Sequence, residues 1–171
     1  ILSLSLTPST VYTDDDLNAV VTSSDADGDG YTITFDWDVS GTTVTTIVPS
    51  LSGDYFEKGD TISVTATPND GTDDGVAVSA GTVSVANSTP EGLSVLIDEE
   101  RPVEGVTDLL CEVDTDATDA DGDAVTYSVS WTVDGTAWTT TSTTVHAGDT
   151  IAGSDTSEGE TWACTMTPND G

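Results

Sequence analysis

Residues 31–39 read YTITFDWDV, with apolar side chains at every second position. Successive side chains of a strand point to opposite faces, so the odd-numbered residues from Tyr31 to Val39 would share one apolar face. Residues 61–67, TISVTAT, alternate in the same way, and glycine, aspartate, asparagine and serine gather between such runs. The pattern predicts an all-β protein.

The same alternation recurs along the whole chain. It predicts strands at residues 2–6, 17–22, 31–39, 43–48, 61–67 and 76–85, and then at 93–97, 108–114, 125–133 and 160–167. Short strands at this spacing, separated by Gly/Asp turns, indicate a β-sandwich or a β-barrel.

Four motifs occur twice in the same order, which indicates an internal repeat. They are DADGD at 25–29 and 119–123, a tryptophan at Trp37 and Trp131, VSGT at 39–42 matched by VDGT at 133–136, and TPNDG at 67–71 and 167–171. The offset is 94 residues at the first motif and 100 at the last. A period of this length is one small domain. We therefore expect two domains, residues 1–88 and 89–171, with a linker near residues 86–90.

The net charge excludes several classes of partner. Lys58 and Arg101 are the two basic residues against 32 acidic ones, which gives a formal charge of −30. A nucleic-acid site needs lysine and arginine to neutralise phosphates, and an anionic membrane surface attracts the same residues. There is also no apolar run long enough to insert into a membrane. The acidity predicts cations as partners, or general solubility in salty surroundings.

The two cysteines and one tryptophan distinguish a sandwich from a barrel. Cys111 stands on the second expected strand of the second copy, Cys164 on its penultimate strand, and Trp131 on the strand after Cys111. This order resembles the immunoglobulin fold, in which a disulfide joins strands B and F and packs on a strand-C tryptophan. The resemblance implies a Cys111–Cys164 bond, and it implies that Trp37 and Trp131 are equivalent core residues.

The resemblance has departures and an alternative. In the first copy the aligned positions hold Ala19 and Val64, so the bond would be optional to the fold. Trp162 stands where the family usually has a tyrosine, so no tyrosine corner is expected. A bond implies an oxidising, extracellular compartment. The alternative is two buried thiols in a reducing compartment.

The combination of DxDGD, a strand ending in tryptophan and TPNDG is similar to the repeats of large secreted and surface proteins of bacteria. It resembles their cadherin-like and polycystic-kidney-disease-like immunoglobulin-like modules, and the similarity covers both copies. It implies a secreted or cell-surface spacer, stalk or adhesive array, often stabilised by calcium.

The acidic loops are the candidate metal sites. Residues 25–30, DADGDG, match the opening of an EF-hand loop, but the closing glutamate and the flanking helices are missing. In the immunoglobulin topology the B–C and F–G loops emerge at the same end, where facing carboxylates would repel unless a cation lay between them. The expected Ca²⁺ ligands are Asp25, Asp27, Asp29, Asp70 and Asp73 in the first copy, and Asp119, Asp121, Asp123 and Asp170 in the second. The alternative is that these are solvated turn formers without metal.

No pattern for catalysis recurs, so we expect no enzyme. His146 is the single histidine and has no counterpart in the first copy. Asn87 begins an N-glycosylation sequon. The expected function is a structural segment of a stalk, sheath or filament. The alternatives are a calcium-dependent adhesin that binds glycans or surface proteins, with Trp138 and the pair Tyr55-Phe56 as candidate exposed aromatics, or an accessory domain of a secreted hydrolase.

The two copies differ after their shared TPNDG motif. The first continues into the alternating run at residues 76–85, which the second lacks. We expect the second sandwich to be incomplete, with its final strand supplied by further residues or by another chain. Neighbouring copies would then join head to tail in an elongated array.

Overall fold

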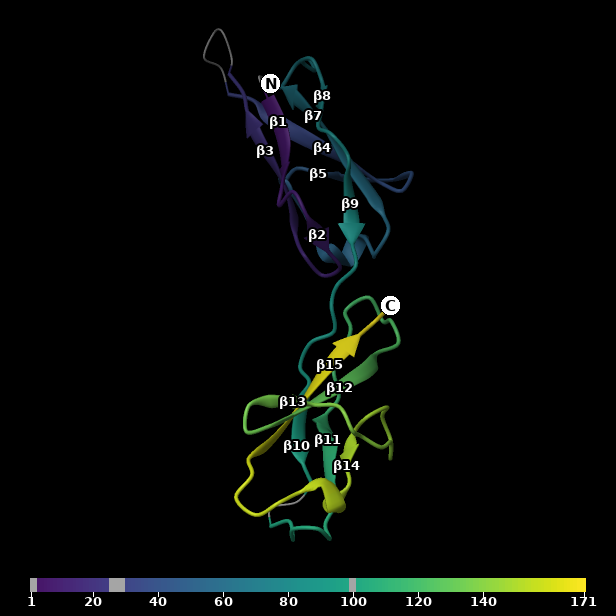
Figure 1. Ribbon diagram of the computed structural model, residues 1–171. Coiled ribbons are helices and arrows are strands. Elements are labelled where there is room, and N and C mark those ends of the chain that lie inside the picture. Colours follow the sequence, from purple (N-terminus) through teal and green to yellow (C-terminus); the bar gives the residue numbers. More distant parts are fainter. Residues whose placement is uncertain (1–2, 25–29, 99–100) are drawn as a thin grey trace. The chain divides into compact units, whose positions relative to one another are not determined.

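The protein is described by a computed structural model that covers residues 3–24, 30–98 and 101–171, and nearly all of its regular structure is β-strand (Figure 1). The chain divides into two compact units, Ile1–Ser88 and Thr89–Gly171. Each unit has one short 3₁₀ turn at the same place, Gly53–Tyr55 in the first and Gly153–Asp155 in the second. None of the helical segments in the described residues is long and apolar enough to cross a membrane.

The first unit is a sandwich of two sheets. One sheet has the order β1 (Ser3–Thr7), β3 (Leu17–Thr22) and β6 (Ser50–Leu51). The other has the order β2 (Val11–Tyr12), β9 (Val83–Ala86), β7 (Thr61–Asn69), β4 (Thr32–Val39) and β5 (Thr42–Thr46), with β8 (Val78–Ser79) also paired to β7. Neighbours are antiparallel except β2 and β9, which are parallel. This is the strand order of an immunoglobulin-like sandwich.

The second unit repeats this architecture with fewer strands. One sheet has the order β10 (Ser94–Ile97), β11 (Leu109–Thr115) and β14 (Thr150–Ile151). The other has the order β13 (Thr136–Trp138), β12 (Thr126–Val133) and β15 (Trp162–Asn169). Among the described residues of the second unit no strand corresponds to β8 and β9, as the sequence predicted.

Trp37 and Trp131 occupy equivalent buried places, on β4 and β12, as expected. Trp37 is fully buried and packs in a core that lies between the two sheets of the first unit. Trp131 is 2% exposed in the smaller core of the second. That core also contains the disulfide between Cys111 and Cys164, whose Cα atoms are 6.1 Å apart. The bridge joins β11 in one sheet to β15 in the other.

Some expected strands end or break earlier than alternation suggested. The run at 76–85 forms two short strands, β8 and β9, and residues 80–82 between them belong to neither strand. The Ala80 N–H still donates to the Val64 carbonyl of β7. The run at 43–48 ends at Thr46, and Ile47 and Val48 are exposed. Here the chain must leave one sheet to reach β6 in the other.

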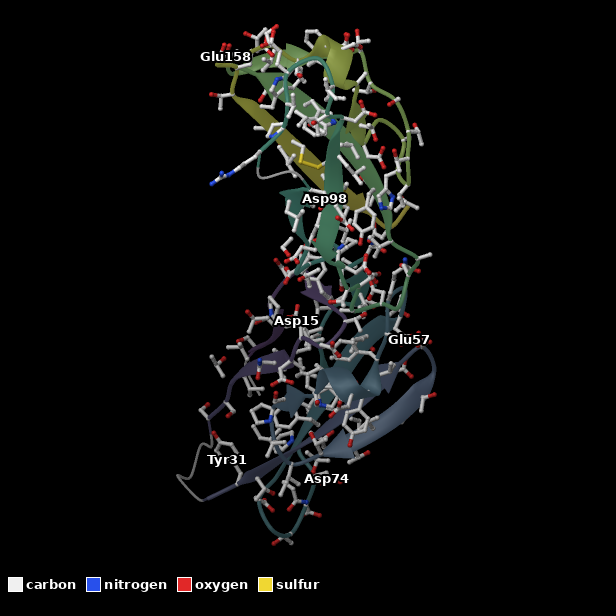
Figure 2. All side chains as sticks on the ribbon, turned by 90° about the horizontal axis from the view of Figure 1, so that it is seen from below. Asp15, Tyr31, Glu57, Asp74, Asp98 and Glu158 are labelled. Atoms are coloured by element: carbon white, nitrogen blue, oxygen red, sulfur yellow. A yellow bond between two sulfur atoms is a disulfide. The ribbon has the colours of Figure 1, made fainter. Side chains whose placement is uncertain are left out.

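The two units also differ in one loop. The offset between equivalent residues is 94 at Trp37 and Trp131 but 100 at Leu51 and Ile151. The difference is six additional residues in the connection between β13 and β14. Side chains ending in oxygen are spread over the surface of both units, as the charge of −30 requires (Figure 2).

Candidate functional site

Among the described residues, one group of three carboxylates comes close enough to hold a metal ion. Asp119, Asp121 and Asp123 each offer an oxygen, and these oxygens lie within 4.8 Å of one another. All three side chains are half-buried. They belong to the loop between β11 and β12, which is the loop that the sequence predicted.

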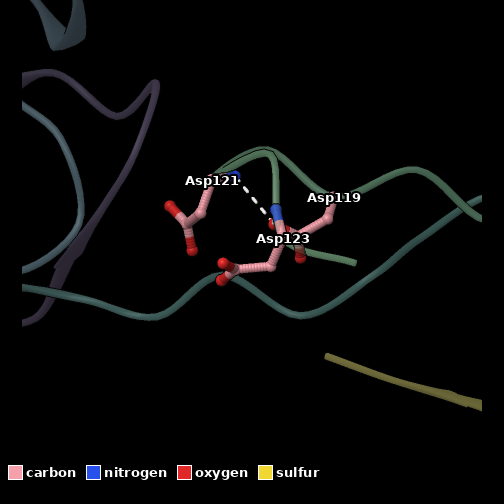
Figure 3. Close-up of side chains that lie close together, drawn as sticks. All are labelled: Asp119, Asp121 and Asp123. Carbon is pink, nitrogen blue, oxygen red and sulfur yellow. Dashed lines mark hydrogen bonds between the residues drawn. The ribbon is translucent and has the colours of Figure 1, made fainter. Parts of the chain in front are cut away.

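A tight turn brings the three side chains together (Figure 3). The Gly122 N–H donates to the Asp119 carbonyl at 3.2 Å, and Gly122 adopts a φ of 77°, a conformation that costs glycine little. The Asp119 Oδ1 atom accepts the backbone N–H groups of Asp121 at 2.9 Å and Asp123 at 3.2 Å. One carboxylate oxygen therefore shapes the turn.

The second oxygen of the Asp119 carboxylate, Oδ2, differs from Oδ1 in its hydrogen bonding. Asp119 Oδ2 is buried and accepts no hydrogen bond from the described residues. A buried acceptor without a partner costs about 1–3 kcal/mol. A cation beside Asp119 Oδ2 would supply the missing partner and would screen the repulsion among the three carboxylates. Hard oxygen donors of this kind suit Ca²⁺ or Mg²⁺.

Asp170, the fourth expected ligand of the second unit, is not part of this group. It follows Asn169, which pairs with Thr126 where β12 begins. Asp170 thus lies directly after β15 and does not join the other three carboxylates.

The corresponding first-unit residues Asp25, Asp27 and Asp29 lie outside the described residues. The other loop of the first unit with expected ligands lies between β7 and β8, and hydrogen bonds fix its conformation. Asp70 Oδ1 accepts the N–H groups of Thr72 at 2.8 Å and Asp73 at 2.9 Å. These bonds hold the pKa of Asp70 below its ordinary value, the one from Asp73 contributing most.

A shallow pocket shows that the two loops of the first unit are neighbours. It is lined on one side by Ser23, Ser24 and Tyr31, which flank residues 25–29, and on the other by residues of the 69–76 turn that include Asp70 and Asp73. The sequence expectation that these loops emerge at the same end is therefore supported for their described parts.

Asp149 is a structural residue that the sequence did not single out. Its side chain is fully buried in the six-residue-longer loop before β14. Its carboxylate accepts the N–H groups of Thr144, Val145 and His146, each at 2.7 Å. The Thr150 hydroxyl donates to it as well, at 2.8 Å. Burial alone would raise the pKa of Asp149, but these hydrogen bonds outweigh it and leave the pKa below its ordinary value.

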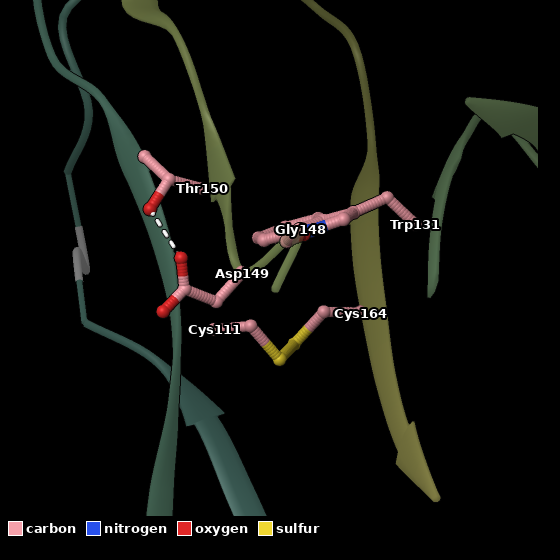
Figure 4. Close-up of a disulfide and its surroundings, with 6 residues drawn as sticks. All are labelled: Cys111, Trp131, Gly148, Asp149, Thr150 and Cys164. Atoms are coloured by element: carbon pink, nitrogen blue, oxygen red, sulfur yellow. Dashed lines mark hydrogen bonds between the residues drawn. A yellow bond between two sulfur atoms is a disulfide. The ribbon is translucent and has the colours of Figure 1, made fainter. Parts of the chain in front are cut away.

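The disulfide lies next to this loop (Figure 4). The Cys111 N–H donates to the Asp149 carbonyl at 2.8 Å, and the indole N–H of Trp131 donates to the Gly148 carbonyl at 3.0 Å. Trp131 and Cys164 are direct partners in the register of β12 and β15. The bridge, the tryptophan and the loop therefore form one packed cluster.

The candidate exposed aromatics are mostly in the core. Trp138 was expected to stand apart from it, but its ring packs edge-on against Trp162 at 5.3 Å in the core cluster. The expected exposure of Phe56 is also wrong, because it is 6% exposed. Tyr55 is 55% exposed, as expected. Trp162 packs edge-on against both Trp131 and Trp138, and its indole N–H donates to a carboxylate oxygen of Glu160 at 3.0 Å.

The remaining candidates have local partners. Asn87, the sequon residue, is exposed, and its side-chain oxygen accepts a hydrogen bond from the Lys58 ammonium group at 2.6 Å. His146 packs edge-on against Tyr127 at 5.2 Å. Glycosylation of Asn87 stays a prediction.

A scan against protein-family models finds none that matches this chain, and a search of curated proteins finds no match either.

Proposed function

We propose that this chain is a structural segment of an extracellular array of immunoglobulin-like units, and that Asp119, Asp121 and Asp123 bind Ca²⁺. The observation that carries the metal assignment is the buried Asp119 Oδ2, which has no hydrogen-bond partner among the described residues and lies in a group of three carboxylates. Ca²⁺ accepts six to eight oxygen ligands in flexible geometry, so three side chains from one turn leave room for carbonyl oxygens and water.

Two further observations support an extracellular structural role. The Cys111–Cys164 bond is of the kind that persists in oxidising compartments. The chain also repeats one sandwich twice, and its motifs resemble those of array-forming modules. A bound cation would rigidify the loop of such a unit by neutralising its clustered charge.

Calorimetric titration of the whole chain with Ca²⁺ tests the metal assignment. Asp121→Asn and Asp123→Asn should each weaken binding by at least an order of magnitude, because each removes a charged ligand but keeps the backbone bonds to Asp119. The matched control is Asp98→Asn, an exposed carboxylate outside the loop. If all three variants bind Ca²⁺ equally well, the three aspartates form an ordinary turn and not a metal site.

The structural role is tested separately by imaging the native material. Fibres, sheaths or surface layers built from this chain would support the proposal. Isolated globular particles under the same conditions would count against an array, whatever the chain does with calcium.

A further inference from the structure

The strand β5 forms one edge of the larger sheet of the first unit. It pairs antiparallel with β4 over its whole length, from Val39↔Thr42 to Phe35↔Thr46, without a bulge. No described residue pairs with its other side. Both ends of β5 continue into described chain, through the turn from β4 and through residues 47–49 to β6. The open edge of β5 therefore belongs to the folded unit itself.

The hydrogen-bond pattern shows which backbone groups lie on this edge. The Ser40 N–H, directly after β4, donates to the Thr61 carbonyl at 2.9 Å, so the even-numbered residues of β4 direct their N–H and C=O groups toward β7. These groups alternate in direction along a strand, so the odd-numbered residues of β4 bond to β5. Their partners are the even-numbered residues of β5. Thr43 and Thr45 therefore direct their backbone N–H and C=O groups toward the open edge.

The sequence of β5 does not protect this edge against the addition of a strand. Natural proteins protect an exposed edge with charged side chains, a proline or a bulge, and β5 has none of the three. The run from Val39 to Gly53 contains no charged residue, although 32 of the 171 residues of the chain are acidic. Thr43 and Thr45 are exposed. The edge thus presents an uncharged backbone with β-branched side chains, which favour strand pairing.

The sequence of β5 is complementary to itself in an antiparallel pair. Thr42–Thr46 reads TTVTT, which is the same in both directions. When two copies pair about Val44, every threonine stands opposite a threonine and the two valines stand opposite each other. Thr43 of one copy then faces Thr45 of the other, and the two residues exchange both N–H···O bonds because both direct their backbone outward. A two-fold contact, which uses the same surface on both copies, requires such symmetry.

The side chains of β5 also fit such a pair on both faces of the sheet. Val44 pairs with Trp37 and packs against the core, so it lies on the inner face. Thr43 and Thr45 lie on the outer face, because successive side chains alternate. Across the pair, the two Val44 side chains would extend the apolar inner face and the threonines would meet on the outer face. Cross-strand pairs of β-branched residues and of threonines stabilise a sheet.

The net charge of −30 opposes association between copies, but little of this repulsion acts at β5. The carboxylates of the neighbouring strand are engaged, since Asp36 accepts the Thr45 hydroxyl at 2.5 Å and Asp38 accepts the Gly41 N–H at 3.2 Å. In the pair, two β5 strands would separate the two β4 strands, which places their carboxylates about 14 Å apart at three strand spacings. This distance exceeds the Debye length of about 8 Å in physiological salt.

We propose that β5 is a self-association edge, at which the first unit binds the first unit of a second copy of this chain through antiparallel pairing of Thr42–Thr46. The occupant is a second copy because TTVTT pairs in full with itself and because an uncharged edge offers nothing to a charged partner. One strand from each copy makes a contact smaller than a permanent dimer interface, so the association is weak and depends on concentration. It involves neither the 119–123 turn nor the second unit.

The first test follows the unaltered whole chain by sedimentation and hydrogen exchange as its concentration is raised in chelator at physiological salt. We expect a dimer at high concentration, in which the N–H groups of Thr43 and Thr45 exchange on the order of tenfold more slowly than in the monomer. Sodium chloride should strengthen the association, because it screens the repulsion between copies. A chain that stays monomeric at millimolar concentration, or a dimer that protects another edge such as β1 in place of β5, would overturn the proposal.

The second test places like charges opposite each other across the pair. In the variant Thr43→Asp with Thr45→Asp, each new carboxylate would face a carboxylate of the other copy, and we expect self-association to weaken on the order of tenfold or more. The matched control is Ser3→Asp with Ser5→Asp, which adds the same charge at exposed positions of β1 and should associate as the parent does. Equal weakening by the two variants would mean that net charge alone governs the association and would contradict the β5 edge.

A mixture of two oppositely charged variants separates loss of the contact from loss of folding. The second variant carries Thr43→Lys with Thr45→Lys, so each ammonium group would face a carboxylate in a mixed pair. We expect the mixed pair to form more tightly than either variant pairs with itself, since opposite charges across strands attract. Both variants should keep the circular dichroism spectrum of the parent. A mixture of folded variants that associates no better than its components would also overturn the proposal.

Discussion

The indole N–H of Trp131 donates to the carbonyl oxygen of Gly148 at 3.0 Å, in the loop that precedes β14. The equivalent indole N–H, on Trp37, is buried without a hydrogen-bond partner among the described residues. The two tryptophans occupy the same place in the same fold, and the longer loop of the second unit supplies the acceptor that the first unit lacks.

This difference predicts unequal responses to one substitution. Trp131→Phe should lower the free energy of unfolding of its unit by about 1–3 kcal/mol more than Trp37→Phe lowers that of the first. The first change breaks a hydrogen bond and leaves the Gly148 carbonyl unpaired, whereas the second removes an unpaired buried donor. Urea unfolding monitored by hydrogen exchange in each unit measures both losses. Equal losses would show that Trp37 has a partner after all.

Removal of the disulfide should destabilise the second unit alone. The bridge spans 53 residues, and closing a loop of that length stabilises a domain by about 4 kcal/mol in the chain-entropy model. The double variant Cys111→Ala with Cys164→Val reproduces the Ala19 and Val64 pair of the first unit. It should still fold, with a lower urea midpoint and an unchanged first unit. If the double variant is as stable as the parent, the disulfide does not stabilise the second unit.

Asp149 should make the second unit sensitive to acid. Its pKa lies below the ordinary value of 3.8 in the folded state, so its stabilising contribution is present above that value and is lost as the pH falls through the folded pKa. Asp149→Asn should cost about 1.5–3 kcal/mol at neutral pH, since it weakens the hydrogen bonds from the loop N–H groups, and should flatten the acid dependence. The comparison is Asp98→Asn, and urea midpoints between neutral pH and pH 3 provide the measurement. Parallel pH profiles for Asp149→Asn and the parent would refute this assignment.

Calcium and ordinary salt should stabilise the chain in different ways. Sodium chloride screens the net charge of −30 and should raise the melting temperature of both units. Ca²⁺ at 100 times its dissociation constant should add about 2.7 kcal/mol to the second unit, because it binds the folded loop. Asp121→Asn, with binding weakened at least tenfold, should reduce the Ca²⁺ increment by about 1.3 kcal/mol or more at the same Ca²⁺ concentration and should keep the salt effect. Melting curves in calcium and in chelator at matched ionic strength distinguish the two, and identical curves would leave screening as the whole effect.

Much of the fold follows from local patterns. Alternation located β3 and β4 to within a residue of their observed bounds. The resemblance of the order Cys111, Trp131, Cys164 to the immunoglobulin fold implied the disulfide that the structure contains. Short strands were missed, among them β2 and β14, because two residues carry no period. Of the candidate metal ligands, the DADGD motif correctly predicted a turn that gathers Asp119, Asp121 and Asp123.

Local sequence patterns and tertiary contacts determine different features of this chain. Side-chain period, turn chemistry and repeated motifs act over a few residues, so the sequence alone was sufficient to predict two β-sandwich units, their boundary and their tryptophan cores. Whether a buried polar atom has a hydrogen-bond partner depends on how the folded chain packs around it. The unpaired Asp119 Oδ2 and the carboxylate of Asp149 inside its loop therefore became visible only in the packed structure, because each depends on which other residues surround a polar group.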